Sequence, residues 1–404
     1  MLPRTPRRHR LIVAGALAAS ALLAAALTGP AVAAPAVGEI RQAGGPTAVP
    51  GSYLVALTDR AAGGPAGTRV AAVSDRADAL AARYGGTVGH RYGHALNGFE
   101  IRLPEPAARR LAADPAVAWV EQNQTVRPTA TQTNAPWNLD FLDQDSSPLS
   151  GTYSYVSTGR GVTAYIIDSG IRLTHVEFGG RARYGYDAVD GAPPADDCTG
   201  HGTHVAGVVG GRTYGVAKEV SLVAVKVTSC GSGGTMAQVV AGINWVTSDH
   251  QAGQPAVANF SLSGAISTAL NTAVANSVAD GIVYTVAAGN SNTNACNYSP
   301  GSVPTAVTVG AVQSNGTRAS FSNYGPCVDI YAPGVSIRSA WYTSDTAADN
   351  LISGTSQAAP HLAGAAARVL QNHPTWTPDQ VIAYLIAEAR IVNGLPVLYL
   401  DPLT

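Results

Sequence analysis

The pattern of apolar and polar positions divides the chain into a small first part and a larger second part. The first part has short apolar runs, which are typical of strands, and periodic apolar positions, which are typical of helices. The expected strands are 53–57, 97–103 and 117–121, and the expected helices are 71–84 and 106–113. Two strand–helix–strand passes of this size predict a small ferredoxin-like α+β unit. The segment 35–50, rich in Pro, Gly and Ala, is typical of a linker, and the polar segment 122–129 predicts an exposed connector.

In the second part, apolar strands and helices of small residues alternate from Trp137 onward. The expected strands are 162–167, 220–227, 256–262, 282–288 and 306–310, and the expected helices are 201–210, 235–249 and 357–371. This alternation predicts an α/β domain with a parallel sheet and helices on both faces. Sites in such sheets form at the carboxyl ends of the strands, and the first expected strand ends at Asp168.

The first 34 residues have the features of a secretory signal. Four arginines precede an apolar run, 11–27, and small residues follow before Pro35, which predicts cleavage near that proline and secretion of the product. A transmembrane anchor is the alternative, but the run is slightly short and ends in a cleavage-like segment. Since no later stretch reaches the roughly 18 apolar residues of a membrane span, the exported product is expected to be soluble, with no membrane partner.

Composition and charge narrow the class of protein. With 44 glycines, 46% hydrophobic residues and 13% charged residues, the chain suits closely packed α/β layers and not a disordered protein. Residues 1–129 carry 14 basic and 8 acidic side chains, whereas residues 130–404 carry 11 basic and 18 acidic ones. The acidic main body argues against a basic surface that would bind nucleic acid. The charge asymmetry indicates that the first third of the chain is a separate unit.

Three motifs in the main body combine into one kind of chemistry. Asp168 follows a buried strand, His201 lies between two glycines at the start of an expected helix, and Ser356 follows a Gly-Thr turn at the start of another. A lone serine before a helix is normally an N-cap. The order Asp, His, Ser, however, is one of the known orders of a catalytic triad, and a helix N-terminus favours the negative charge of an oxyanion.

Residues 130–404 resemble the subtilisin-like serine proteases, most closely the proteinase K branch with its aqualysin-type bacterial relatives. Outside the triad, the resemblance rests on the segments 134–140, 286–290, 297–300 and 320–325. Residues 50–127 resemble the inhibitory pro-domain of that family, which assists folding and occupies the active site until it is cleaved. The resemblance implies a signal peptide at 1–34, a linker and pro-domain at 35–129, and a peptidase domain at 130–404, with processing at Thr129–Ala130.

Chemistry and resemblance together assign the catalytic roles. Ser356 is the expected nucleophile, His201 the base that takes its proton, and Asp168 the carboxylate that orients the imidazole. Asn290 matches the side-chain donor of the family's oxyanion hole, with the backbone N–H of Ser356 as the second donor.

Three segments resemble the substrate-binding strands and pocket of the family. The expected substrate-binding residues are Gly231, Ser232, Gly233, Ser261, Leu262, Ser263, Ala287, Ala288 and Gly289. None of them is charged, so an apolar or aromatic side chain is expected before the cut. Ser263 stands where the family usually has glycine, which affects the expected fine preference and not the chemistry.

The four cysteines, Cys198, Cys230, Cys296 and Cys327, all lie in the main body. An even number in an exported chain suggests disulfides, for which three pairings exist, and free buried thiols are the alternative. The resemblance to the aqualysin-type group implies the pairs 198–230 and 296–327. The histidines His204, His361 and His175 lack a third ligand at suitable spacing, so they are interpreted as structural and not metal-binding.

The resemblance also implies structural calcium. Asp329 with the carbonyls of Pro304 and Ala306 matches a calcium site of the proteinase K branch, and hard oxygen ligands suit Ca²⁺. Asp140, Asp143 and Gln144 are a second candidate set of calcium ligands, with weaker support, because Ser150 occupies the position of an expected acidic ligand. Both sets of ligands are implied by the resemblance alone.

The sequence therefore predicts a secreted serine endopeptidase of proteins and peptides, made as a self-processed zymogen, inhibited by its own pro-domain and acting as a monomer without an organic cofactor. One alternative is a binding module without catalytic activity. The triad residues and Asn290 are all present in the sequence, which argues against it. An α/β-hydrolase esterase is the other, but Ser356 lacks a Gly-x-Ser-x-Gly context and the triad order differs.

Overall fold

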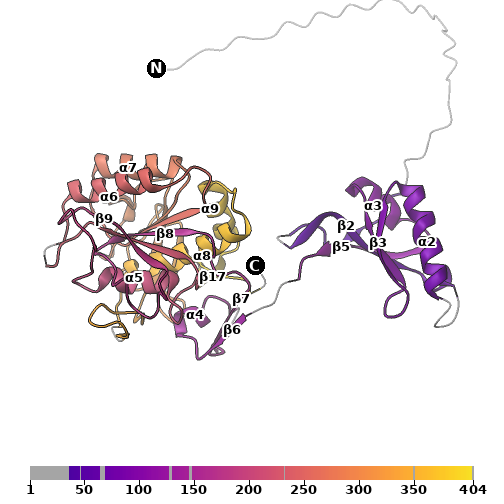
Figure 1. Cartoon of the computed structure of the whole chain (residues 1–404), viewed down its shortest axis with the longest axis horizontal. Helices are drawn as coiled ribbons and strands as arrows, with labels where there is room; N and C mark the ends of the chain where they lie inside the picture. The colour runs from indigo at the N-terminus through magenta and orange to yellow at the C-terminus, as the bar shows by residue number, and fades with distance from the viewer. Residues whose placement is uncertain are drawn as a thin grey trace, which may run out of the picture. The chain divides into compact units, whose positions relative to one another are not determined.

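The computed structural model describes residues 36–45, 47–63, 69–126, 130–144, 148–231, 233–348 and 351–402. The chain divides into two compact units, with the boundary between Thr125 and Val126 (Figure 1). The expected signal segment 1–34, the processing site after Thr129 and the substrate-binding residue Ser232 lie outside the described residues. Within the described part, no helix is both long and apolar enough to span a membrane.

The first unit is an α+β structure built on one sheet with the strand order β1-β5-β2-β4-β3. Its strands are β1 (Ile40–Arg41), β2 (Ala48–Leu57), β3 (Thr87–Tyr92), β4 (Gly98–Arg102) and β5 (Val117–Gln124), and its helices are α1 (Asp59–Ala62), α2 (Arg69–Tyr84) and α3 (Glu105–Ala112). Apolar side chains of the sheet, such as Val55, Phe99 and Val120, are fully buried together with Leu111 of α3. This arrangement confirms the predicted ferredoxin-like unit.

Two strands of this unit correct the sequence interpretation. The segment 35–50 is not only a linker, because β1 pairs in parallel with β5 and β2 already begins at Ala48. β3 has no apolar alternation to detect, since most of its residues are exposed. Its place in the sheet comes from backbone pairing with β4, which a pattern of side chains does not record.

The second unit is organised around a nine-stranded sheet in the order β17-β18-β16-β15-β13-β11-β8-β10-β9. Its strands are β8 (Thr163–Asp168), β9 (Ala182–Asp187), β10 (Ser221–Lys226), β11 (Ala256–Phe260), β13 (Val283–Ala287), β15 (Val307–Val312), β16 (Ile330–Pro333), β17 (Arg390–Val392) and β18 (Leu395–Val397). All neighbours pair in parallel except β17 and β18, which are antiparallel. Two small antiparallel pairs join β6 (Ala130–Thr133) to β7 (Thr152–Tyr155) and β12 (Gly264–Ala265) to β14 (Tyr298–Ser299).

Helices cover both faces of this sheet, as predicted (Figure 1). The helices of this unit are α4 (Trp137–Asp140), α5 (His201–Gly210), α6 (Met236–Asp249), α7 (Thr268–Ala279), α8 (Thr355–Asn372) and α9 (Pro378–Ala387), with a 3₁₀ turn at Ala295–Asn297. Alternate residues of β8 enter different cores: Ala164 and Ile166 pack in the core with α5 and α8, whereas Tyr165 and Ile167 pack in the core with α6 and α7. A strand buried on both faces is therefore apolar throughout, which explains its continuous apolar run.

Small residues bring α8 against its neighbours. A Cβ on Gly364 would lie 2.6 Å from Val216 Cβ and 3.0 Å from the carbonyl oxygen of Val209 in α5. Any larger residue would push the two helices apart, and α8 carries the serine of the expected triad. Close packing of α8 on α5 thus positions its first turn beside His201, the first residue of α5.

Candidate active site

The carboxylate of Asp168 and the imidazole of His201 meet at the carboxyl end of the central strands. Asp168 is the last residue of β8 and is completely buried. The His201 Nδ1 atom lies 2.8 Å from Asp168 Oδ1 and 3.0 Å from Oδ2. This contact fixes the ring orientation and leaves the opposite nitrogen, Nε2, to exchange protons.

Two glycines beside His201 make this approach feasible. Gly200 has φ of +89°, and a Cβ there would lie 2.5 Å from the ring of Trp341. A Cβ on Gly202 would overlap the carbonyl oxygen of Gly170, just after β8. Glycine at position 202 therefore lets the start of α5 touch the end of β8, and glycine at position 200 leaves room for the Trp341 ring.

A second buried carboxylate, Asp197, holds the same region together and was not found from the sequence. It accepts hydrogen bonds from the Ser169 hydroxyl at 2.9 Å, from the N–H of Gly200 at 2.9 Å and from the N–H of Thr203 at 2.8 Å. Asp197 thus caps the N-terminus of α5, where N–H groups lack partners within the helix. The only sequence signal is an acidic residue just before a helix, which is common in ordinary caps.

The pKa of His201 is set by opposing effects. Burial lowers it, whereas the charge and hydrogen bond of Asp168 raise it, and the charge of Asp197 adds to the rise. The result is a pKa above the ordinary value of histidine. A base of this kind is stabilised in its protonated form, which it must adopt after taking a proton from a nucleophile.

Ser356 and Asn290 face one another across Gly354. Asn290 Oδ1 accepts hydrogen bonds from the N–H and the hydroxyl of Thr355, both at 2.8 Å, so its amide nitrogen remains to serve as a donor. A Cβ on Gly354 would lie 2.9 Å from Ser356 Oγ and 3.3 Å from Asn290 Nδ2. The expected donor and the expected nucleophile therefore border the same small space, which is what an oxyanion hole would require.

The three residues of the expected triad line a cavity of about 480 Å³. Of the expected substrate-binding residues, those that line it are Gly231, Gly233, Ser261, Leu262, Ser263 and Ala287. Asp168, His201, Asn290 and Ser356 line the same cavity. The structure also adds Thr199, Thr228 and Ser229 to its wall, which no motif had indicated.

Ala288 and Gly289 lie behind this wall and not on it. The side chain of Asn323 holds them: its Nδ2 donates to the carbonyl of Ala288 at 2.8 Å, and a Cβ on Gly289 would overlap that nitrogen. Gly289 also has φ of +100°, which disfavours other residues. Asn323 therefore shapes the loop that leads to Asn290.

The disulfides pair Cys198 with Cys230 and Cys296 with Cys327, and no described cysteine is free. This is the pairing that the resemblance implied. The first bridge joins the residue after Asp197 to the residue before Gly231, so it links the support of His201 to the cavity wall. In the chain-entropy account each bridge contributes about 3–4 kcal/mol.

The expected calcium ligands contain one partly buried carboxylate. Asp329 Oδ2 accepts the N–H of Thr308 at 2.7 Å, and burial raises the pKa of Asp329. A carboxylate whose charge is disfavoured by burial has the oxygen donor chemistry that suits Ca²⁺. Among the described residues, no group of three or more His, Cys, Asp and Glu side chains is arranged to hold a metal ion.

The weaker second set is already supplied with hydrogen-bond donors. Asp140 accepts the N–H and the hydroxyl of Ser150 and the N–H of Gly151. Asp143 accepts the N–H of Ser154 at 2.7 Å. Ser150 therefore binds Asp140 directly where an acidic residue would have shared a cation with it.

The three histidines that the sequence analysis interpreted as structural make contacts with the backbone. His204 Nε2 lies 2.9 Å from the carbonyl of Ile337, and His175 Nε2 lies 2.8 Å from that of Ala347. His361 lies between Asn138 and the carbonyl of Gln357. These contacts agree with the structural interpretation of all three.

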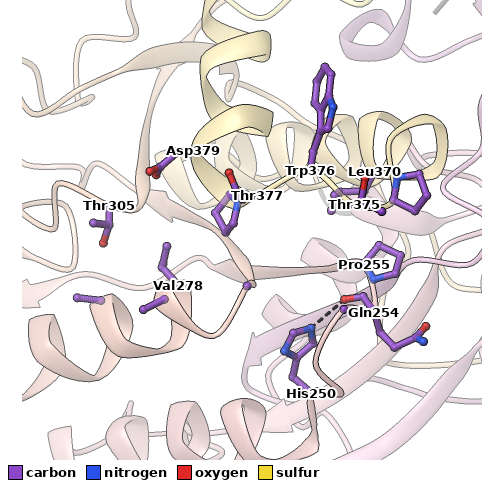
Figure 2. A pocket seen from close by; sticks show the side chains of 16 residues that line it. His250, Gln254, Pro255, Val278, Thr305, Leu370, Thr375, Trp376, Thr377 and Asp379 are labelled. Carbon is purple, nitrogen blue, oxygen red and sulfur yellow. Dashed lines mark hydrogen bonds between the residues drawn. The ribbon is translucent and has the colours of Figure 1, made fainter.

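A second pocket, of about 560 Å³, lies away from the triad between the ends of α7 and α9 (Figure 2). Its wall includes Val278, Leu370 and Thr377, and His250 Nε2 lies 2.9 Å from the carbonyl of Gln254. No member of the triad lines it. The expected catalytic residues therefore all lie at the smaller cavity.

Comparison with known protein families matches residues 159–399 to the subtilase family. This chain belongs to the subtilase family. The subtilase also matches peptidase inhibitor I9 at residues 52–129. It is thus a subtilisin-like serine protease made with an inhibitory pro-domain, which confirms the resemblance inferred from the motifs.

Individual relatives agree with this family. The subtilase is 49% identical over 352 residues to the extracellular serine proteinase of Thermus sp. (strain Rt41A), covering 84% of this chain and 85% of that protein. It is 47% identical to alkaline serine exoprotease A of Vibrio alginolyticus, covering 77% of this chain and 59% of that protein. The crystal structure of a cold adapted subtilisin-like serine proteinase is 48% identical, with a TM-score of 0.63, and the match covers 66% of this chain and 98% of that one.

Proposed function

We propose that this subtilase is a secreted endopeptidase that cleaves proteins through an acyl-enzyme on Ser356, with His201 as base and Asp168 as its orienting carboxylate. The observation that carries the proposal is the contact of His201 Nδ1 with Asp168 in a cavity that Ser356 and Asn290 also line. His201 is the first residue of α5, a helix of small residues, and Ser356 follows the turn at Gly354 at the start of α8. The two groups are therefore held on different helices that pack against the central sheet.

The reaction follows from the positions of the protons. Ser356 Oγ bonds to the scissile carbonyl carbon, its proton passes to His201 Nε2, and the carbonyl π electrons move to the oxygen. The oxyanion is stabilised by Asn290 Nδ2 and the N–H of Ser356, each worth about 3 kcal/mol in comparable sites. The C–N bond then breaks as His201 returns the proton to the leaving amine, and water repeats the sequence to release the acid.

Substrate preference follows from the cavity wall. The lining residues Gly231, Gly233 and Leu262 offer backbone and apolar surface, and none of the expected substrate-binding residues carries a charge. We therefore assign an apolar or aromatic residue before the cut. Ser263 Oγ would lie 3.4 Å from a Cβ on Gly289, so this serine adds a polar atom near the base of the pocket.

The chain organisation that we propose is a signal peptide at 1–34, a linker and pro-domain at 35–129 and a mature peptidase at 130–404 that acts as a monomer. The I9 match ends at residue 129, and the compact second unit begins close by, at Val126. The extracellular serine proteinase of Thermus sp. supports secretion. The pro-domain is then the internal inhibitor of the mature unit.

Calcium is the expected structural ion. Asp329 with the carbonyls of Pro304 and Ala306 would hold it, and the ion would neutralise a carboxylate whose pKa burial raises. Its contribution would be to the stability of the fold, since these residues do not line the catalytic cavity.

Casein hydrolysis by the purified mature chain, with and without a serine-directed organophosphate, tests the proposal. The expected result is hydrolysis that stops when the reagent labels Ser356. A chain that binds casein without cleaving it would be a catalytically silent binding module, and hydrolysis of esters without peptides would indicate an esterase. Either result would overturn the proposed function.

A further inference from the structure

The side chain of Gln357 touches the nucleophile itself. The Ser356 hydroxyl donates to Gln357 Oε1 at 2.9 Å. Gln357 is completely buried, and its Nε2 atom has no hydrogen-bond partner among the residues that the structure describes. Its Oε1 would lie 2.9 Å from a Cβ on Gly354, the same place that Ser356 Oγ and Asn290 Nδ2 border. The amide therefore occupies the edge of the oxyanion site.

The backbone of Gln357 is fixed by two further buried side chains. Its carbonyl oxygen accepts a hydrogen bond from His361 Nδ1 at 2.8 Å, and His361 Nε2 lies 2.8 Å from Asn138 Nδ2. Burial lowers the pKa of His361 to about 4, so near neutral pH the ring keeps one proton, on Nδ1, for this bond. The first turn of α8 is thus held in register, and the Gln357 amide stays beside Ser356.

A serine hydroxyl has one hydrogen to donate. While Gln357 Oε1 accepts the Ser356 hydrogen, His201 Nε2 cannot accept it. Among the described residues, no hydrogen bond links Ser356 Oγ to His201, although both line the cavity. We propose that Gln357 sets the resting state of the nucleophile, holding the Ser356 hydrogen away from His201 until substrate binds. This inference rests on the proposed function.

The contact has a defined place in the reaction. Before acylation, the Ser356 hydrogen must leave Gln357 Oε1 and turn to His201 Nε2, which then takes the proton as Oγ bonds to the carbonyl carbon. In the acyl-enzyme, Oγ carries the acyl group and no hydrogen, so Gln357 has nothing to accept. Deacylation begins with the transfer of a water proton to His201, and it does not require the contact to break. Gln357 therefore slows acylation and leaves deacylation unchanged.

The experiment separates the two steps in the mature enzyme and in its Gln357→Met and Gln357→Leu variants. Stopped-flow burst kinetics with a p-nitrophenyl ester give both rate constants, and a peptide p-nitroanilide, with its poor leaving group, reports acylation as kcat. We expect both variants to raise the acylation rate constant about two- to tenfold, because one neutral hydrogen bond is lost from the ground state. The deacylation rate constant should not change.

Gln357→Glu provides the opposite change. It keeps an acceptor beside Ser356 and makes it a stronger one, so acylation should become slower than in the parent enzyme. Titration of active sites with an irreversible organophosphate normalises every rate to folded enzyme, so incomplete folding of a buried variant does not mimic the result. Ser248→Ala, an exposed substitution on α6, serves as the control and should match the parent.

Slower or unchanged acylation in both the Met and Leu variants would overturn the inference; slower acylation would show that the amide assists the transition state. Equal acceleration of acylation and deacylation would also overturn it, since the contact exists only before acylation. Failure of the proposed function looks different, because the parent enzyme itself would then release no product from the peptide substrate.

Discussion

The Asp197 carboxylate accepts the hydroxyl hydrogen of Ser169 at 2.9 Å and thereby ties the turn after Asp168, the proposed orienting carboxylate, to the helix that begins at His201. The same carboxylate caps that helix through the N–H groups of Gly200 and Thr203. Two carboxylates therefore act on one imidazole: Asp168 by contact, and Asp197 through its charge and through the position of α5.

Replacing Asp197 by Asn should shift the acid limb of the pH profile of kcat/KM to lower pH. Asp168 and Asp197 both raise the pKa of His201, and the base is active only when neutral, so activity grows as pH rises through that pKa. Loss of one charge lowers the pKa and lets the neutral form persist at lower pH. The lost cap should also destabilise the fold by about 1–3 kcal/mol. Peptide hydrolysis from pH 4 to 9 measures the limb.

Asp379→Asn on α9 is the matched control, because this carboxylate is exposed and lies outside the catalytic cavity. Its acid limb should coincide with that of the parent. An unmoved limb in Asp197→Asn would contradict the electrostatic role and reduce Asp197 to a helix cap.

Sequence patterns predicted the helices α5, α6 and α8 and the buried strands of the central sheet such as β8, but they missed the helices α7 and α9. Glycine contexts also marked Asp168, His201 and Ser356 as the candidate triad. The helix at 201–210 agrees with α5 at both ends. They could not reveal Asp197, because its importance lies in contacts to residues before and after it that only folding brings together. Asn323 lies in the segment 320–325 that resembles the family, but its contact with Ala288 from another loop could not be predicted, for the same reason.

Strands held by backbone pairing were also missed. β9 and β16 lie in the main sheet, but their short sequences carry no length or periodicity that distinguishes them from loops. Ala288 and Gly289 do not line the cavity in the unbound chain, so their assignment to the substrate pocket stays a prediction.

Ser356→Ala should leave a stable precursor that retains the pro-domain. If the triad performs the cleavage near Thr129, removal of its nucleophile removes self-processing. Intact mass of the secreted protein, produced in a host without other secreted proteases, measures this. The exposed substitution Ser248→Ala should be processed normally, and normal trimming of Ser356→Ala would show that another protease makes the cut.

Chelation should lower the melting temperature of the mature enzyme, and Asp329→Asn should remove that response. The ion would stabilise a carboxylate whose charge is disfavoured by burial, so its loss destabilises the native state alone. Thermal unfolding of inhibited enzyme, with calcium and with chelator, measures the effect. Asp379→Asn should respond as the parent does, and a parent whose melting temperature ignores chelator would remove calcium from the account.

Acid should destabilise the native state through His361. Burial lowers its pKa from 6.5 to about 4, so the unfolded chain takes up a proton first as pH falls below 6.5. Stability present at pH 7 is therefore lost progressively between pH 6.5 and 4, by about 3 kcal/mol in total. Melting temperatures of inhibited enzyme at pH 7 and pH 4.5 measure this loss. His361→Gln should show a smaller difference between the two pH values; an equal difference would assign the acid response to other groups.

Activity should persist in peroxide, because the residue that follows the expected nucleophile is a glutamine and not an oxidisable methionine. Oxidation of a thioether beside Ser356 would add a polar oxygen at the oxyanion site, and Gln357 cannot undergo that reaction. Once the signal has been removed with Met1, the remaining methionine is Met236, which is partly exposed at the start of α6. It lies 3.1 Å from a Cβ position on Gly264 and does not line the catalytic cavity. Its oxidation should therefore leave the triad intact.

Residual peptidase activity over a peroxide titration, for the parent and for Gln357→Met, measures the difference. The variant should lose activity at peroxide concentrations that the parent tolerates, and loss at the same concentration in both would assign the damage to a residue other than the neighbour of Ser356.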